Sequence, residues 1–209
     1  LSSNAYDALA DEVKMINKEA CSSVPEISRF FLICDHRRKI LSHINDYPAF
    51  SHYLKKIIKP EYNIIIHNIL YLKANKHGIK RHINSTLKDN LSIAGLGDIG
   101  NSYSSPDYQT VYYVNVPNDL DDQGKLTIYE TGTSTTLNPV DNRFIEFSGG
   151  LPHEVSSITT TGTRITLFTE QYKISPIDLI KMQDEFVDKG TMYGIKESAS
   201  DGEFQMPYD

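Results

Sequence analysis

The sequence has 209 residues, 39% of them hydrophobic, and a formal net charge of −6. This length can bury one sizeable core but is short for two, so we expect a single domain over 1–209. The negative charge and scattered lysines and arginines exclude a broad basic face for nucleic acid. The sequence contains no run of about 18 apolar residues, so it shows no membrane-spanning segment.

The cysteine content bears on the cellular setting. Cys21 and Cys34 are too few for a disulfide framework and show no paired metal-binding spacing. The first residues also lack the charged and then apolar pattern of a signal peptide. We therefore expect a reducing, cytoplasmic setting and a small or peptidic partner rather than a nucleic acid or a membrane.

Residues 1–61 are expected to form an N-terminal helical support. Tyr6, Leu9 and Val13 recur at three- and four-residue steps, which predicts an amphipathic helix over 3–20. A second apolar pattern predicts a helix over 48–58 that ends before Pro60.

From residue 62 to 172 the sequence turns to short β-branched and aromatic stretches divided by Gly, Pro, Asn and Asp. Strands are expected at 62–74, 79–87, 109–116, 125–130, 134–138, 143–148, 153–159 and 163–172. Short strands at such intervals are typical of a sandwich or jelly roll. The expected fold class is therefore mainly β.

Two further segments complete the chain. Residues 89–108 are rich in Gly and Ser and too long for a hairpin connection, so we expect a long irregular loop of functional importance. Ser175 and Pro176 have the pattern of an N-cap followed by a first-turn proline, which predicts a helix over 177–189. Residues 173–209 would then form a C-terminal helix and a polar tail.

Two of the seven histidines stand in distinctive contexts. His82 and Asn84 are two apart on the predicted strand 79–87, so both side chains should point to one face and could meet a single ion. His153 begins a later strand, and Arg164 and Thr166 share one face of the last strand. The other histidines are interpreted as surface or satisfied structural residues: His36, His43, His52, His67 and His77.

Six segments follow one another in an order that is hard to explain by chance. They are His82-Ile83-Asn84, Thr110-Val111-Tyr112-Tyr113-Val114-Asn115, Gly124-Lys125-Leu126, the Pro139 to Phe147 segment with Arg143, His153-Glu154-Val155 and Gly162-Thr163-Arg164-Ile165-Thr166. Over residues 62–172 this order resembles the prolyl-hydroxylase-like Fe(II)- and 2-oxoglutarate-dependent oxygenases. The resemblance implies a double-stranded β-helix (jelly roll) core with flanking N-terminal and C-terminal α-helices.

The resemblance also implies site residues and cofactors. His82, Asn84 and His153 would be the catalytic metal ligands for Fe(II), leaving positions open for 2-oxoglutarate and O₂. Arg164, Thr166 and Tyr113 would bind the distal carboxylate of 2-oxoglutarate, because a planar guanidinium pairs well with a carboxylate.

Asn84 stands where the family has a metal-binding Asp, and a neutral amide lacks the Coulomb attraction of a carboxylate. Three interpretations stay open for it: an unusual native ligand, an inactivating change, or the mark of a catalytically silent relative. Asp89 and Asp98 could substitute as ligands, although neither has the family spacing. The turn at Gly124 also differs slightly from the family pattern, because it has Gln123-Gly124 where the family usually has a glycine pair.

The first hypothesis is an oxygenase that hydroxylates, or otherwise oxidises, an unactivated C–H bond of an amino acid, peptide or small metabolite, with loop 89–108 covering the mouth of the site. The second is a catalytically silent jelly-roll protein that binds a ligand. The third is a metal-binding cupin of unrelated chemistry. The pair Arg164 and Thr166 favours the first two, because a cupin has no reason to place it eleven residues beyond its histidine.

Overall fold

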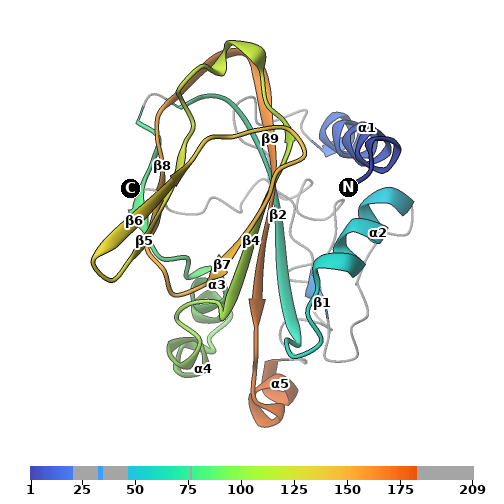
Figure 1. Cartoon of the computed structure of the whole chain (residues 1–209). Coiled ribbons are helices and arrows are strands. Elements are labelled where there is room, and N and C mark those ends of the chain that lie inside the picture. The colour runs from blue at the N-terminus through green and yellow to red at the C-terminus, as the bar shows by residue number, and fades with distance from the viewer. Residues whose placement is uncertain (21–32, 35–46, 76, 183–209) are drawn as a thin grey trace.

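The computed structural model describes residues 1–20, 33–34, 47–75 and 77–182. Two antiparallel sheets form the centre (Figure 1). The larger has the order β1 (Ile33–Cys34), β2 (Ile64–Asn75), β9 (Ile158–Tyr172), β4 (Tyr108–Asn115) and β7 (Phe144–Ser148). The smaller has the order β3 (Ile79–His82), β8 (His153–Val155), β5 (Leu126–Glu130) and β6 (Thr133–Leu137). This arrangement confirms the predicted jelly roll.

The longest strand differs from its prediction. We expected strands at 153–159 and 163–172 with a break at 160–162, but the break lies at 156–157, and β9 runs unbroken from Ile158. Its first residues pair with the far end of β2, where Ala74 lies opposite Thr159 after a register shift. The bulge absorbs the Thr- and Gly-rich stretch that suggested a turn, so pairing with β2 decides the length of the strand.

Alternation along the strands separates two environments. In β9, Ile165 and Leu167 belong to the core cluster under the N-terminal helices, whereas Arg164 and Thr166 line a pocket between the sheets. Neighbouring β4 follows the same rule, because Tyr113 lines that pocket. The inside of the jelly roll thus receives every second residue of both strands.

Two helices cover the outer face of the larger sheet (Figure 1). These are α1 (Ser3–Ala20) and α2 (Pro48–Ile57), and both agree with their predictions. Leu9 of α1 and Phe50 of α2 are fully buried in one cluster with sheet residues. The Glu12 carboxylate also accepts hydrogen bonds from the first backbone N–H groups of α2, at Ala49 (3.0 Å) and Phe50 (2.8 Å). A carboxylate from α1 therefore caps α2.

The expected irregular loop at 89–108 is wrong. The segment contains the end of α3 (Thr86–Ile93) and all of α4 (Gly97–Ser102). Leu87 and Leu91, four residues apart, are fully buried in a cluster with β2 and β9. Gly100 reflects close packing, because a Cβ there would lie 3.0 Å from the Lys88 carbonyl oxygen. A short 3₁₀ helix (Asn118–Leu120) and α5 (Pro176–Met182) complete the described elements.

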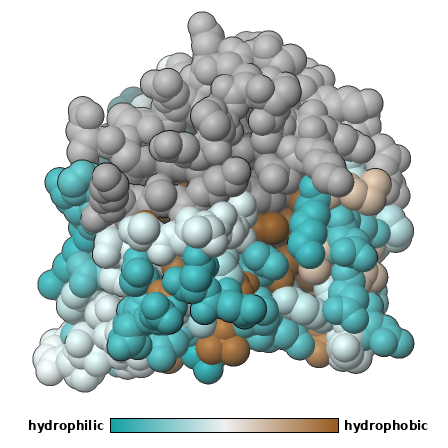
Figure 2. Space-filling view, turned by 90° about the horizontal axis from the view of Figure 1, so that it is seen from above, coloured by the Kyte–Doolittle hydropathy of each residue, from teal (hydrophilic) through white to brown (hydrophobic). Residues whose placement is uncertain are grey.

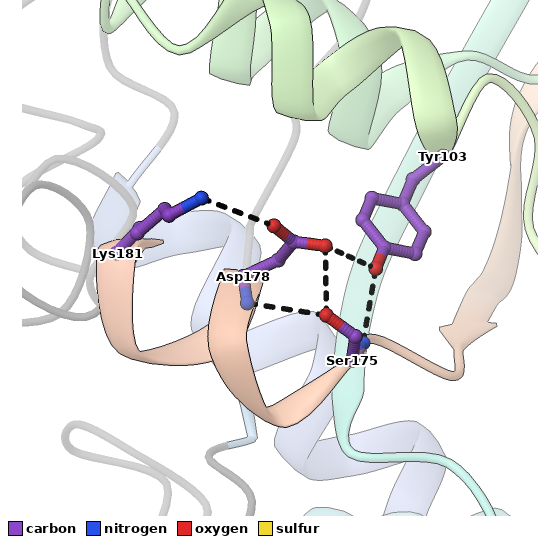
Figure 3. Close-up of polar contacts among 4 residues, drawn as sticks. All are labelled: Tyr103, Ser175, Asp178 and Lys181. Carbon is purple, nitrogen blue, oxygen red and sulfur yellow. Dashed lines mark hydrogen bonds and ion pairs between the residues drawn. The ribbon is translucent and has the colours of Figure 1, made fainter.

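The first turn of α5 is held by a reciprocal capping arrangement (Figure 3). Ser175 Oγ accepts a hydrogen bond from the Asp178 N–H (3.2 Å) and donates to the Asp178 carboxylate (2.7 Å). Tyr103 OH donates to the same carboxylate and accepts from the Ser175 N–H, each at 2.9 Å. This network joins α5 to the end of α4. The remainder of the helix predicted over 177–189, from 183 onward, lies outside the described residues.

Removing this cap should destabilise the protein modestly. Ser175→Ala loses both Oγ contacts, and loss of an N-cap typically costs about 1 kcal/mol. For a chain of this size we expect a fall in Tm of about 2–4 °C, measured by thermal denaturation. Ser104→Ala, at an exposed turn, is the control. An unchanged Tm for Ser175→Ala would contradict the capping role.

Among the described residues, no helix is long and apolar enough to cross a bilayer. On the face seen in Figure 2, hydrophobic residues of the described part form small separate patches between hydrophilic ones.

Candidate active site

His82 and His153 lie directly opposite each other on neighbouring strands. The antiparallel pairing of β3 and β8 makes them partners in the ladder, with ring centroids 4.5 Å apart. The two histidines are 71 positions apart in the chain, and the sheet brings them to one face. The predicted histidine pair is therefore formed.

Each histidine is held in a defined orientation by a backbone carbonyl two residues earlier. Nδ1 of His82 lies 2.7 Å from the Lys80 oxygen, and Nδ1 of His153 lies 3.0 Å from the Leu151 oxygen. A carbonyl only accepts, so each Nδ1 carries a proton and donates. In the neutral ring, each Nε2 then presents a lone pair, which is how outer hydrogen bonds prepare histidines to bind a metal.

Burial lowers the pKa of His153 to about 4, and the neighbouring His82 adds to the lowering. The Leu151 carbonyl opposes the shift but does not cancel it. His153 is therefore neutral at physiological pH. A neutral imidazole with a lone pair on Nε2 is the form that coordinates metal ions.

Asn84 completes this group, but from a different element than expected. The strand predicted over 79–87 ends at His82, and α3 begins at Thr86. Asn84 in the connection still places Oδ1 3.1 Å from Nε2 of His82 and Nδ2 3.3 Å from Nε2 of His153. The three predicted ligands therefore come together, although strand alternation is not what aligns them.

Neither aspartate considered as a substitute ligand joins the histidines. In the described part of the chain, no three His, Cys, Asp or Glu side chains gather into a group that could hold a metal ion. The Asp89 carboxylate instead accepts a hydrogen bond from Ser85 Oγ at 2.7 Å, and Asp98 is exposed in the first turn of α4. A metal at this site would have two imidazoles and one amide oxygen.

Arg164 is a buried cation with no acidic partner in the described structure. Its side chain is 2% exposed, and its one described hydrogen bond runs from Nη1 to the Gly124 oxygen at 3.0 Å. Nε has no partner, and neither does the buried hydroxyl of Thr166. Burial lowers the pKa of Arg164, as expected for a cation that lacks an anion.

Gly124 and Tyr113 shape the surroundings of Arg164. Gly124 has a φ of +66°, which favours glycine, and a Cβ there would lie 2.9 Å from Nη1 of Arg164. The ring of Tyr113 lies 5.9 Å from the guanidinium, and burial raises the pKa of its hydroxyl. Tyr113 thus keeps its proton at neutral pH and can donate a hydrogen bond.

All six predicted site residues line one pocket between the two sheets. Its apolar lining includes Leu70, Ile79, Val111, Leu126, Val155 and Phe168. The polar lining includes the His82, Asn84 and His153 group and the unpaired donors of Arg164 and Thr166. Tyr113, Thr86 and Glu170 complete it. A buried cation and a free hydroxyl in an apolar pocket are the groups that a carboxylate would satisfy.

Two polar residues on the strands of this site were missed from the sequence. Gln109, fully buried on β4, hydrogen-bonds Asn84, and Glu170, fully buried on β9, lines the pocket. Each lies an even number of positions from a predicted residue on its own strand, Tyr113 and Arg164 respectively. The period of two along a strand was the signal that could have found them.

The histidines outside the site agree only in part with their interpretation as surface or satisfied structural residues. His52 and His77 are exposed. His67 is fully buried, with Nδ1 2.6 Å from Thr169 Oγ1 and Nε2 unpaired, so it is not fully satisfied. His36, His43 and Cys21 lie outside the described residues.

Glu170 gives the site a pH-dependent contribution to stability. Burial raises its pKa to about 7, although hydrogen bonds from Tyr172 and Thr86 oppose the shift. The folded pKa lies above the unfolded value of 4.5. The resulting stability is therefore complete below pH 4.5 and is lost as the pH rises through about 7.

Glu170→Gln should remove this loss. Its Tm relative to the wild type should increase between about pH 5 and about pH 8, because glutamine cannot ionise. Thermal melts at both pH values test this. A Tm difference that does not change with pH would show that Glu170 does not titrate in this range.

The fold is similar to that of several solved structures. The match to Pseudomonas putida prolyl-4-hydroxylase has 14% sequence identity and a TM-score of 0.51, and it covers 84% of this chain and 89% of that protein. IDO from Bacillus thuringiensis is 12% identical, covers 80% and 85%, and has a TM-score of 0.54. The rice dioxygenase for auxin oxidation is 8% identical, covers 85% and 71%, and has a TM-score of 0.50.

No family model and no curated protein matches the sequence. At these identities the likeness concerns the fold alone, a jelly roll that is shared with a prolyl-4-hydroxylase and a dioxygenase. The resemblance inferred from the ordered motifs is confirmed at that level.

Proposed function

We propose that this protein is an Fe(II)- and 2-oxoglutarate-dependent oxygenase that hydroxylates, or otherwise oxidises, an unactivated C–H bond. The substrate would be an amino acid, a peptide or a small metabolite. The observation that carries the proposal is the buried Arg164, whose unpaired Nε shares one pocket with two histidines that present Nε2 atoms. The fold, which occurs in oxygenases, supports the same conclusion.

The protein residues would divide the work between two ends of the pocket. His82, His153 and Asn84 Oδ1 would hold the metal, with both imidazoles already oriented by backbone carbonyls. Arg164 and Thr166 would bind the distal carboxylate of 2-oxoglutarate, and Tyr113 could donate a further hydrogen bond. The apolar lining would exclude water and strengthen these contacts.

Iron and 2-oxoglutarate bound together would supply the oxidant, with one atom of O₂ entering succinate as CO₂ leaves and the other entering the substrate. Arg164 would set the position of 2-oxoglutarate relative to the histidines. Asn84, as a neutral ligand, would leave more positive charge on the metal than a carboxylate does. Iron affinity should consequently be lower than with an Asp at this position.

A catalytically silent ligand-binding protein is the second candidate, and one observation favours it. Nδ2 of Asn84 lies 3.3 Å from Nε2 of His153, so the amide can satisfy the lone pair that a metal would otherwise use. Such a protein would bind 2-oxoglutarate or a similar dicarboxylate through Arg164 without turnover.

The two candidates differ in O₂-dependent succinate release. We expect the wild-type protein with Fe(II) and 2-oxoglutarate to release succinate, faster when a suitable substrate is added. His153→Ala, which removes a ligand, should bring release to the background level of iron without protein, whereas the exposed His52→Ala should behave as wild type. Equal release by wild type and His153→Ala would overturn the oxygenase proposal.

A further inference from the structure

The partly buried amide of Asn84 begins a hydrogen-bond relay that continues through a buried side chain. Asn84 Nδ2 donates to Gln109 Oε1 at 2.5 Å, and Gln109 Nε2 donates to the Gly149 oxygen at 2.7 Å. Gln109 is fully buried, so water cannot replace either contact. The relay connects the candidate metal site to the turn that follows β7.

The acceptor at the end of this relay is fixed in place. Gly149 N–H donates to the Asp107 oxygen at 3.1 Å, and a Cβ at Gly149 would lie 2.1 Å from the Pro106 oxygen. The turn is therefore packed tightly against the segment before β4. Small shifts of the backbone at Gly149 could not absorb a change at Gln109.

The direction of every hydrogen bond follows from that carbonyl. The Gly149 oxygen can only accept, so the Gln109 amide must turn its nitrogen toward it and its oxygen toward Asn84. The Asn84 amide must then turn its nitrogen toward Gln109. Its Oδ1 is left facing Nε2 of His82 at 3.1 Å. In the neutral ring that Nε2 presents a lone pair, so two acceptors face each other here, and only a cation or a proton between them would satisfy both.

A carboxylate at position 84 would conflict with this relay. One of its oxygens would replace Nδ2 and meet Gln109 Oε1 at about the present 2.5 Å. Rotating the Gln109 amide would relieve that contact but would place Oε1 against the Gly149 oxygen. Either arrangement leaves two acceptors, one of them on the fully buried Gln109, facing each other without a donor, which is unfavourable.

We infer that Gln109 is a positioning residue that makes position 84 specific for an amide and turns its oxygen toward the metal ligands. The metal itself rests on the proposed function, but the relay exists without it. This inference favours one of the three interpretations of Asn84, that of a native ligand. The surrounding side chain and backbone accommodate an amide and not a carboxylate.

A double-mutant cycle in metal-free protein tests the relay. Asn84→Asp should lower the Tm by about 3 °C or more when Gln109 is present, by the usual relation between stability and Tm for this size. In a Gln109→Met background, which has no acceptor oxygen, the same substitution should lower the Tm much less. Melts are recorded at about pH 8 with a chelator, so that the introduced carboxyl group is ionised and no metal contributes.

Asn84→Ala is the matched control for this cycle. It removes the hydrogen bond without adding a carboxylate, so its coupling to Gln109→Met should be smaller than that of Asn84→Asp. Equal Tm shifts for Asn84→Asp in the two backgrounds would overturn the inference.

A second readout covers the case in which Gln109→Met folds poorly. Gln109→Leu has no hydrogen-bonding side chain either, and its Mn(II) affinity should be roughly tenfold weaker than wild type, the usual effect of losing a residue that orients a metal ligand. Unchanged Mn(II) affinity would overturn the orienting role. A wild-type protein that binds neither Mn(II) nor 2-oxoglutarate would overturn the proposed function, while the metal-free cycle would still decide the relay.

Discussion

Arg164→Met should nearly abolish 2-oxoglutarate binding and at the same time raise the stability of the ligand-free protein. Loss of the charge-assisted contact should weaken binding by about 2–5 kcal/mol, the usual effect of removing one partner of a buried charged pair. This corresponds to roughly 30-fold or more in Kd. Anaerobic calorimetry of 2-oxoglutarate binding measures it.

The gain in stability has the same physical origin. The buried guanidinium has no anionic partner in the described structure, and a desolvated, unpaired charge opposes folding. Methionine removes that charge and fills similar space, at the loss of one hydrogen bond to Gly124. We expect a higher Tm than wild type without ligand and no further rise when 2-oxoglutarate is added.

Arg143→Met is the matched control, because Arg143 donates to the Asn138 oxygen and does not line the pocket. It should leave 2-oxoglutarate affinity unchanged. Equal affinity of wild type and Arg164→Met would show that Arg164 does not bind the ligand.

Asn84→Asp should bind Mn(II) or Fe(II) more tightly than the wild type, by at least about tenfold. The substitution places a negative charge on a ligand of a divalent cation, and its attraction exceeds that of a neutral amide oxygen. Metal titration by calorimetry gives the affinities of the two proteins.

Succinate release by the same pair separates the interpretations of Asn84. A native ligand predicts turnover by the wild type, whereas an inactivating change predicts turnover only after Asn84→Asp. A silent ligand-binding protein would stay inactive in both forms. Unchanged metal affinity in Asn84→Asp would mean that residue 84 does not face the metal.

The jelly roll could be predicted from the order of the motifs along the chain. The shared face of Arg164 and Thr166 could be predicted from strand alternation, which is a local property. Arg164 and Thr166 share a face by their spacing alone, and they do line one pocket. The segment around α3 was misread because its Gly and Ser content outweighed the four-residue spacing of Leu87 and Leu91, which are in fact buried. Composition was the weaker signal there.

Other features depend on contacts between distant segments. The length of β9 follows from pairing with β2, and the orientation of Asn84 follows from Gln109 and Gly149, 25 and 65 positions further along the chain. That Arg164 has no acidic partner among the described residues can be seen only in the folded structure. A single sequence indicates which residues face inward, whereas the structure determines which of them meet.

In the proposed function the metal and the 2-oxoglutarate carboxylate would share one pocket, so we expect their binding to be coupled. The most direct test is anaerobic calorimetry of 2-oxoglutarate binding with and without Fe(II). We predict that Fe(II) tightens 2-oxoglutarate binding by at least about tenfold and, by linkage, that 2-oxoglutarate tightens Fe(II) binding by the same factor. His153→Ala should remove the coupling but keep the weaker binding to Arg164. Equal 2-oxoglutarate affinity with and without Fe(II) in the wild type would contradict a shared site.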